Sequence, residues 1–333
     1  MTATVTMPGT RFASGSPALF RGGILIGATL LLVIALRDIE WDRLLQLLRG
    51  LRLPWVAVAV GLNGSIIVLW SLQWRILVPG EGSVTWANMF LVVSAMAMIS
   101  NSVPFMVGQA SGVLLLARYG RIGTASALSV YTMEQVAEGI AKIVVVIGVA
   151  LFAPLPTWLA RGVQGLAVVV AGLGLTFVAL AFRFRLPPAA LRPAGALDRL
   201  KHFGAQWAHS LEGLRTPPVF GAGVALALGM KAAELGGILA VQQALGLALP
   251  VGTALLVLAS VNFATIVSVS PGNLGVFEAA AFAAYRLTGV SPEHALTLSL
   301  VQHVCYLIPM LGVGYVYGGM RVFRELRNPA APS

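Results

Sequence analysis

The sequence feature that most constrains the fold is a break in an apolar region of the C-terminal half. The region reads as membrane-embedded helix from about Val251 to Leu287, but Pro-Gly-Asn-Leu-Gly interrupts it at residues 271–275. Proline removes a backbone donor and glycine relaxes the backbone, so a helix is expected to end here. In hydrocarbon, a broken backbone is tolerated only where protein or a water-filled cavity surrounds it. The break therefore predicts either a kinked packing helix or a half-helix that lines a substrate path.

Composition places this break inside a membrane protein. Of the 333 residues, 58% are hydrophobic and 10% are charged, against about 25% charged in soluble domains. A soluble globular fold and a disordered chain are both excluded. The net charge of +10 comes from basic residues between apolar runs, which is typical of cytoplasmic loops rather than of nucleic-acid binding. The single cysteine, Cys305, excludes an internal disulfide and a cysteine-based zinc site.

A second interrupted apolar region lies in the N-terminal half. Residues 86–100 are few for a membrane crossing, which takes about 20 residues, and they run into Asn-Ser-Val-Pro at residues 101–104. When the prolines of the two breaks are aligned, Gly108 falls on Gly275 without a gap. Matching interruptions in two halves of a chain are typical of transporters built from repeats.

The distribution of basic residues favours two re-entrant hairpins. If residues 86–100 and 251–269 each crossed the membrane alone, the basic loop at 183–217 would face outward, against the positive-inside rule. If each interrupted region enters and leaves on one side, that loop and both termini lie inside. The two hairpins then open to opposite faces. Two full crossings in each region would give the same loop placement, but the helical pieces are short for that.

The expected fold is an all-α polytopic inner-membrane protein with both termini cytoplasmic. It has about six full spans plus two re-entrant helical hairpins arranged as an inverted repeat. Trp74 and Arg75 are expected to anchor the end of the second span at the interface. The predicted segments are a disordered N-terminus (1–20), a first transmembrane helix with an interfacial amphipathic helix (21–53), a first membrane half (54–182), a basic cytoplasmic loop (183–217), a second membrane half (218–319) and a basic cytoplasmic tail (320–333).

Four charged residues within the predicted spans are spaced for ion pairs. Glu138 precedes Lys142 by four positions, and Lys231 precedes Glu234 by three. Each charge costs at least about 2.5 kcal/mol at the bilayer centre, so all four should face the bundle interior and pair. These pairs either lock helices together or take part in transport, and the spacing does not decide between the two roles.

Two acids, Glu134 and Glu278, have no partner at helical spacing. Either could contact a lipid head group or act as a protonatable switch, and either could instead be bonded to backbone. Glu278 is expected in the first turn after the break, where free amides and the helix dipole suit an anionic group. Because the sequence has no HExxH pattern, nucleophile elbow or P-loop lysine, we predict no metal, cofactor or catalytic residue.

These motifs resemble those of the lysylphosphatidylglycerol synthase transmembrane-region family, a group of flippase-like integral membrane proteins. The resemblance covers roughly residues 51–319 and is most specific at residues 271–278, Pro-Gly-Asn-Leu-Gly-Val-Phe-Glu. The family includes the flippase half of the multiple peptide resistance factor, which moves aminoacylated phosphatidylglycerol between leaflets. Other relatives are associated with hopanoid or glycolipid pathways. This chain has Val107, Gln109 and Gln135 where the family commonly has charged residues, so the resemblance does not specify an aminoacylated head group.

The resemblance implies movement of a polar-headed lipid between leaflets: a phospholipid, an aminoacylated lipid, a glycolipid or a hopanoid. The alternatives are a membrane-embedded enzyme with Glu278 or Glu134 as its base, and a non-transporting member of a lipid-synthesis complex. The expected partners are membrane lipids and lipid-biosynthesis enzymes, without nucleic acid; the oligomeric state stays open. The candidate substrate-binding residues are Asn101, Pro104, Gly108, Gln109, Glu134, Asn262, Ser270, Pro271, Gly272, Asn273, Gly275 and Glu278.

Overall fold

The computed structural model describes residues 40–78, 84–103, 107–153, 217–266 and 270–327, with isolated positions between 157 and 172. Within these ranges every regular element is a helix. Six predicted features lie wholly or partly outside them: the N-terminus (1–20), the first transmembrane helix, most of the span expected at 163–182, the basic loop up to residue 216, Pro104, and the last six residues of the tail.

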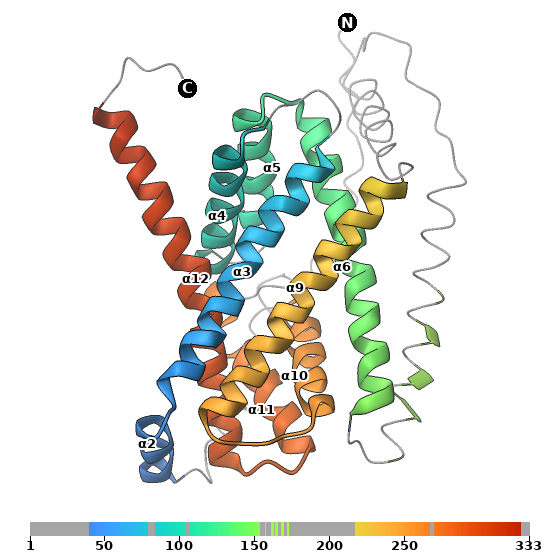
Figure 1. Ribbon diagram of the computed structural model, residues 1–333, viewed down its shortest axis with the longest axis vertical. Helices are drawn as coiled ribbons and strands as arrows, with labels where there is room; N and C mark the ends of the chain where they lie inside the picture. The colour runs from blue at the N-terminus through green and yellow to red at the C-terminus, as the bar shows by residue number, and fades with distance from the viewer. Residues whose placement is uncertain are drawn as a thin grey trace, which may run out of the picture.

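The described helices follow the apolar segments of the sequence (Figure 1). Four are long and apolar enough to cross a membrane: α3, α6, α9 and the first 27 residues of α12. In chain order the elements are α2 (Trp41–Arg49), α3 (Leu53–Leu77), α4 (Trp86–Ser102), α5 (Val107–Tyr119), α6 (Thr124–Phe152), α9 (Pro217–Ala244), α10 (Val251–Ala264), the 3-10 turn η2 (Pro271–Asn273), α11 (Val276–Leu287) and α12 (Pro292–Arg327).

Helix α12 extends further than the sequence predicts. We expected the second membrane half to end at residue 319 and a tail to begin at residue 320, but the helix continues to Arg327. The segment after Val316 carries three arginines and a glutamate between apolar residues. Arginine and glutamate are good helix formers, so a helix continues there although the sequence is no longer apolar enough for hydrocarbon.

The break after α10 has a backbone that only a few residue types adopt readily. Gly272 and Asn273 have φ angles of 59° and 54°, and Gly275 has φ 84°. Left-handed backbone is easy for glycine and tolerated by asparagine. Gly275 is then the N-cap of α11, and the Glu278 side chain accepts a hydrogen bond from its amide. The Pro-Gly-Asn-Leu-Gly sequence thus forms the turn that leads into α11, whereas α10 ends earlier than the sequence predicts, at Ala264.

The first hairpin is held together by close helix contact. A Cβ atom at Gly108 of α5 would overlap Ser100 of α4, and one at Gly112 would overlap Met96. At the outer end of the hairpin, Asn88 Nδ2 donates to the Tyr119 carbonyl over 3.4 Å. Both ends of the α4–α5 pair are therefore fixed, and the hairpin is a packed unit.

The two hairpins lie at opposite ends of the bundle, and their tips meet in its middle (Figure 1). Helices α3 and α9 pack side by side; α3 also contacts α4 of the first hairpin, and α9 contacts α10 of the second. Helix α4 contacts η2, and a Cβ atom at Gly272 would lie 3.3 Å from the Asn101 carbonyl oxygen. The turn is thus packed against α4 at Gly272, which is buried, while Pro271 and Leu274 of the same turn are exposed.

The expectation that Trp74 anchors α3 at the membrane interface is wrong. Its side chain is completely buried and belongs to the core cluster that contains Leu77 and Met89. Arg75, the next residue, is exposed. A tryptophan near the end of a span can face neighbouring helices as well as head groups, and α3 packs here against α9 and α4.

Cysteine labelling tests the hairpin arrangement. In a Cys305→Ala background, a membrane-impermeant maleimide is expected to label Ala87→Cys and Thr124→Cys from the cytoplasmic face. Val251→Cys and Leu287→Cys should be labelled from the opposite face, because each pair brackets one hairpin. The cysteine-free protein is the control. Labelling of two members of one pair from opposite faces would mean that a helix crosses the membrane alone, and would contradict the re-entrant arrangement.

Candidate functional site

A polar cavity of about 280 Å³ lies where the hairpin tips meet. It is bounded by α4 and α5 of the first hairpin, α10 and η2 of the second, and the long helices α3, α6, α9 and α12. A cavity lined by charged side chains inside an apolar bundle is expected to be functional rather than a packing defect. Its polar lining consists of Trp70, Ser100, Asn101, Gln109, Tyr131, Glu134, Gln135, Glu138, Lys142, Lys231, Glu234, Asn262, Thr265, Asn273 and Tyr306.

The Lys231 ammonium is the centre of the charged network. Its Nζ lies 2.7 Å from Glu138 Oε1, 2.8 Å from Glu234 Oε1 and 3.0 Å from Asn262 Oδ1. An ammonium has three donors, so these contacts satisfy it fully although the side chain is only 6% exposed. They join α6, α9 and α10 at one point. The spacing of Lys231 and Glu234 anticipated one of the contacts; those to Glu138 and Asn262 come from other helices.

Lys142 is the second base of the network and lies at its edge. Its Nζ is 3.4 Å from Glu138 Oε1, so the pair expected from helical spacing is present, but the side chain is 36% exposed. Glu138 therefore lies between two lysines, with the closer contact to Lys231. The Glu138 carboxylate thus takes part in a buried pair with Lys231 and in a partly exposed pair with Lys142. The buried pair contributes most to holding the helices together.

Acids outnumber bases in the cavity. The lining contains three glutamates, Glu134, Glu138 and Glu234, and two lysines, Lys142 and Lys231. Glu134 is buried, and its Oε2 accepts a hydrogen bond of 2.8 Å from Gln135 Nε2. An unbalanced buried carboxylate is unfavourable in a low-dielectric interior. A proton, or a cationic or hydrogen-bond-donating group of a bound molecule, would balance it.

Several polar atoms of the lining are buried without a hydrogen-bond partner among the described residues. They are Trp70 Nε1, Ser100 Oγ, Gln109 Oε1 and Asn273 Oδ1. Leaving such a group unsatisfied costs about 1–3 kcal/mol. These atoms come from α3, both arms of the first hairpin and the tip of the second, and they mix donors with acceptors. They suit water or the polar groups of a ligand.

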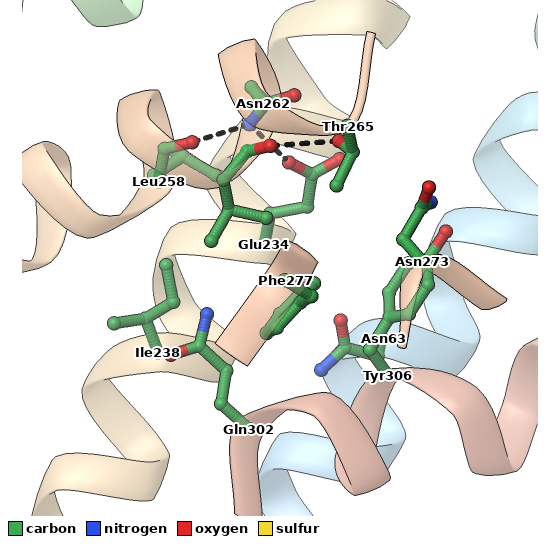
Figure 2. A pocket seen from close by; sticks show the side chains of 11 residues that line it. Asn63, Glu234, Ile238, Leu258, Asn262, Thr265, Asn273, Phe277, Gln302 and Tyr306 are labelled. Atoms are coloured by element: carbon green, nitrogen blue, oxygen red, sulfur yellow. Dashed lines mark hydrogen bonds between the residues drawn. The ribbon is translucent and has the colours of Figure 1, made fainter. Parts of the chain in front are cut away.

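A smaller cavity of about 100 Å³ adjoins the first and shares Glu234, Asn262, Thr265, Asn273 and Tyr306 with it. Figure 2 shows Glu234 and Asn262 on one side of this space and Tyr306 and Asn63 on the other. Asn262 Nδ2 donates to the Leu258 carbonyl over 2.8 Å and lies 3.3 Å from Glu234 Oε2. The residues shared by the two cavities make a continuous polar surface from the first hairpin to the interior of the second half.

Glu278 does not line either cavity. Its Oε2 accepts a 2.7 Å hydrogen bond from the Gly275 amide, and its Oε1 lies 2.6 Å from His303 Nδ1. The other ring nitrogen of His303 lies 2.8 Å from the Gly272 carbonyl oxygen. Both carboxylate oxygens are thus occupied by protein, so the side chain fastens the turn to α12. A lone buried histidine 25 residues away gave no pattern from which this partner could be predicted.

The other candidate residues divide into two groups. Gly108 serves helix packing, and Gly275 has no atom within 4 Å of a would-be Cβ, so its φ angle of 84° is what requires glycine there. Ser270 donates from its hydroxyl to the Leu274 carbonyl and, with Pro271 and Gly272, builds the turn. Pro104 lies outside the described residues. The candidates that line the larger cavity are Asn101, Gln109, Glu134, Asn262 and Asn273.

Replacing Lys231 tests the charged network. Lys231→Met keeps the length of the side chain but leaves Glu138 and Glu234 facing each other without their shared cation. Breaking a buried ion pair from one side costs about 3–5 kcal/mol, so the melting temperature in detergent should fall sharply. Lys142→Met is the matched control, expected to cost about 1 kcal/mol or less because that side chain is partly exposed. Equal losses for the two variants would contradict the central place of Lys231.

Comparison with known proteins agrees with this architecture. The family model described as "Lysylphosphatidylglycerol synthase TM region" matches residues 21–314, which include both hairpins and every cavity-lining residue named above. No individually curated protein matches the sequence. The match covers most of the 333-residue chain, and four described helices are able to span a bilayer. The chain therefore belongs to the lysylphosphatidylglycerol synthase transmembrane-region family and is a multi-pass membrane protein.

Proposed function

We propose that the protein moves a polar-headed lipid between the leaflets of the inner membrane. The observation that carries the proposal is the charged cavity between two hairpin tips at the middle of an apolar bundle. A head group needs polar partners at this depth, since hydrocarbon offers none. Unpartnered donors and acceptors together with an excess of acids would supply them. The acyl chains would stay in the surrounding lipid.

The packing of the helices supports an inverted repeat as the basis of transport. In the proposed correspondence, α3, α4, α5 and α6 of the first half match α9, α10, α11 and α12 of the second. Helix α4 packs against α12, and its counterpart α10 packs against α6; likewise α3 contacts α12, and α9 contacts α6. Each contact thus has its exchanged equivalent, as two halves related by an axis in the membrane plane require. One hairpin would then gate each face.

The orientation of the protein follows from charge. The end of the bundle with the α4–α5 hairpin carries Arg75, Arg118 and Arg121, and α12 ends there with three arginines (Figure 1). We assign this end to the cytoplasm by the positive-inside rule. The first hairpin would admit the head group from the cytoplasmic leaflet and the second from the outer leaflet.

Transport is favoured over catalysis by the surroundings of the acids. A general base needs a free oxygen within reach of the substrate. Both oxygens of Glu278 contact protein, and Glu278 does not line the cavity. Glu134 faces the cavity with one oxygen bonded to Gln135, but no described side chain forms a nucleophile–base pair with it. The lining is better suited to binding than to bond breaking.

Gln109 offers the sharpest test of the cavity as the lipid path. In proteoliposomes with fluorescent lipid and an external quencher, Gln109→Leu is expected to slow transbilayer movement about tenfold. Its Oε1 has no protein partner among the described residues, so the substitution removes a ligand contact while no described hydrogen bond of this oxygen is lost. Gln46→Leu on the exposed surface of α2 is the matched control. Wild-type movement by a folded Gln109→Leu protein would contradict a path through the cavity.

A further inference from the structure

The tip of the second hairpin is fastened to α12 by three hydrogen bonds that link four residues. Gly275 N–H donates to Glu278 Oε2, Glu278 Oε1 contacts His303 Nδ1, and His303 Nε2 contacts the Gly272 carbonyl. His303 is 1% exposed and Glu278 is 8% exposed. These hydrogen bonds start at Gly275 on one side of the break and end at Gly272 on the other. Both sides of the break are therefore held to one residue of α12, His303.

The geometry fixes how many hydrogens the His303 and Glu278 side chains must carry between them. A carbonyl oxygen only accepts, so the contact with Gly272 requires a hydrogen on His303 Nε2. The 2.6 Å contact between His303 Nδ1 and Glu278 Oε1 also needs a hydrogen between the two atoms. A neutral imidazole has one N–H, which the first contact already uses. The pair therefore carries one proton more than a neutral histidine beside a carboxylate.

The surroundings favour keeping that proton. The Phe277 ring stacks on the His303 ring with centroids 4.2 Å apart and 7° between planes, and an aromatic face favours a cationic ring. Besides Glu278 and His303, the ionisable residues of the packed helices are Tyr285 and Arg286 on α11 and Lys231 and Glu234 on α9; α4 and α10 have none. Those of α12 are Cys305 and Tyr306 near His303, and Glu293, His294, Tyr315, Tyr317, Arg321, Arg324, Glu325 and Arg327 toward its two ends. The charges on α9 are engaged with Glu138 and Asn262.

Among the described residues, the elements further from His303 also bring no replacement for the proton. Helix α3, which touches α12, has Arg75 as its one ionisable residue, in its last turn. Helix α2 has Arg43 beside Glu293 at the start of α12. If the proton left, an unneutralised carboxylate would remain buried next to a neutral ring. Such a charge is strongly unfavourable in an apolar interior.

We propose that Glu278 and His303 form a proton-binding site and that the bound proton latches the tip of the second hairpin to α12. Loss of the proton leaves His303 with one N–H for two acceptors, Glu278 and the Gly272 carbonyl, so one of its two hydrogen bonds is lost and the turn that carries Asn273 is freed. Asn273 lines both cavities, so its release changes the wall of the lipid site. The latch is present below the pH at which the pair gives up its proton and is lost above it. That the proton drives lipid movement rests on the proposed function; the latch itself does not.

Glu278→Gln separates a proton latch from a fixed structural bond. The glutamine amide nitrogen can donate to His303 Nδ1 while His303 Nε2–H donates to Gly272, and the glutamine oxygen can accept from Gly275. All three hydrogen bonds are then kept although the histidine is neutral and no proton is shared. This variant should hold the tip at every pH. His303→Phe keeps the stacking on Phe277 but removes both hydrogen bonds of His303. In this variant the tip should not be held against α12 at any pH.

Hydrogen–deuterium exchange of the full chain in nanodiscs measures the latch directly. The reporter is the peptide that spans Asn273 to Ala279, whose amides bond to Ser270, Pro271, Glu278 and Gly275. Exchange is compared between wild type and Glu278→Gln at each pH from about 6 to about 9.5, a range beginning near the pKa of free histidine, about 6.5. The comparison at equal pH cancels the intrinsic pH dependence of exchange.

The expected result is equal exchange of the two proteins at the acidic end and about tenfold faster wild-type exchange at the alkaline end, as the loss of a buried charged hydrogen bond predicts. A ratio that does not change with pH would overturn the proposal, whatever the lipid-transport activity. His294→Gln, at the start of α12, is the matched histidine control and should leave the ratio unchanged. If His303→Phe does not fold, the wild-type to Glu278→Gln ratio still decides the outcome.

Nitrogen-15 spectra of labelled histidine give a second readout. At the acidic end of the range, the His303 signals should show hydrogen on both ring nitrogens in wild type and on Nε2 alone in Glu278→Gln. Four histidines are present in the chain, so replacing His303 assigns its signals. A wild-type His303 that is a single-hydrogen tautomer at acidic pH, with Glu278 ionised, would contradict the shared proton.

Discussion

The architecture depends on a lysine buried in the middle of an apolar bundle. An ammonium at this depth is tolerated only when each of its hydrogens has an acceptor. Lys231 meets this condition by drawing Glu138 from α6, Glu234 from α9 and Asn262 from α10. The first half of the chain is thereby tied to the second. The same requirement explains why polar side chains gather here, since the three groups that satisfy Lys231 also line the cavity.

The broken backbone of the second hairpin also needs hydrogen-bond partners for its polar groups, and it finds them in a different way. Its turn is satisfied internally by Ser270 and by the cap of Glu278 on Gly275, and externally by His303. A rigid tip then meets the first hairpin at Asn101. Two short hairpins that enter from opposite ends can meet only if both turns are stable in the bundle interior. The clamp at His303 and the ion network at Lys231 therefore support the same central cavity from its two sides.

How well the sequence predicts a contact depends on how far apart in the sequence its two residues lie. The break at Pro271, the start of α11 and the pairs of Glu138 with Lys142 and Lys231 with Glu234 depend on neighbours within a few positions, and the sequence indicates them directly. The bond of Glu278 to His303 and the bond of Lys231 to Glu138 join residues 25 and 93 positions apart. Nothing in a single sequence specifies which helices face each other, so these contacts, like the burial of Trp74, emerged only with the structure.

Photocrosslinking most directly tests whether the cavity receives a lipid head group. A diazirine amino acid is placed at Tyr306, which lines both cavities, or at Val304, which is exposed on α12. After illumination in native membranes, mass spectrometry locates the attachment point on the captured lipid. The account predicts attachment through the head group at position 306 and through the acyl chain at position 304. Acyl-chain attachment at both positions, or no lipid at position 306, would contradict it.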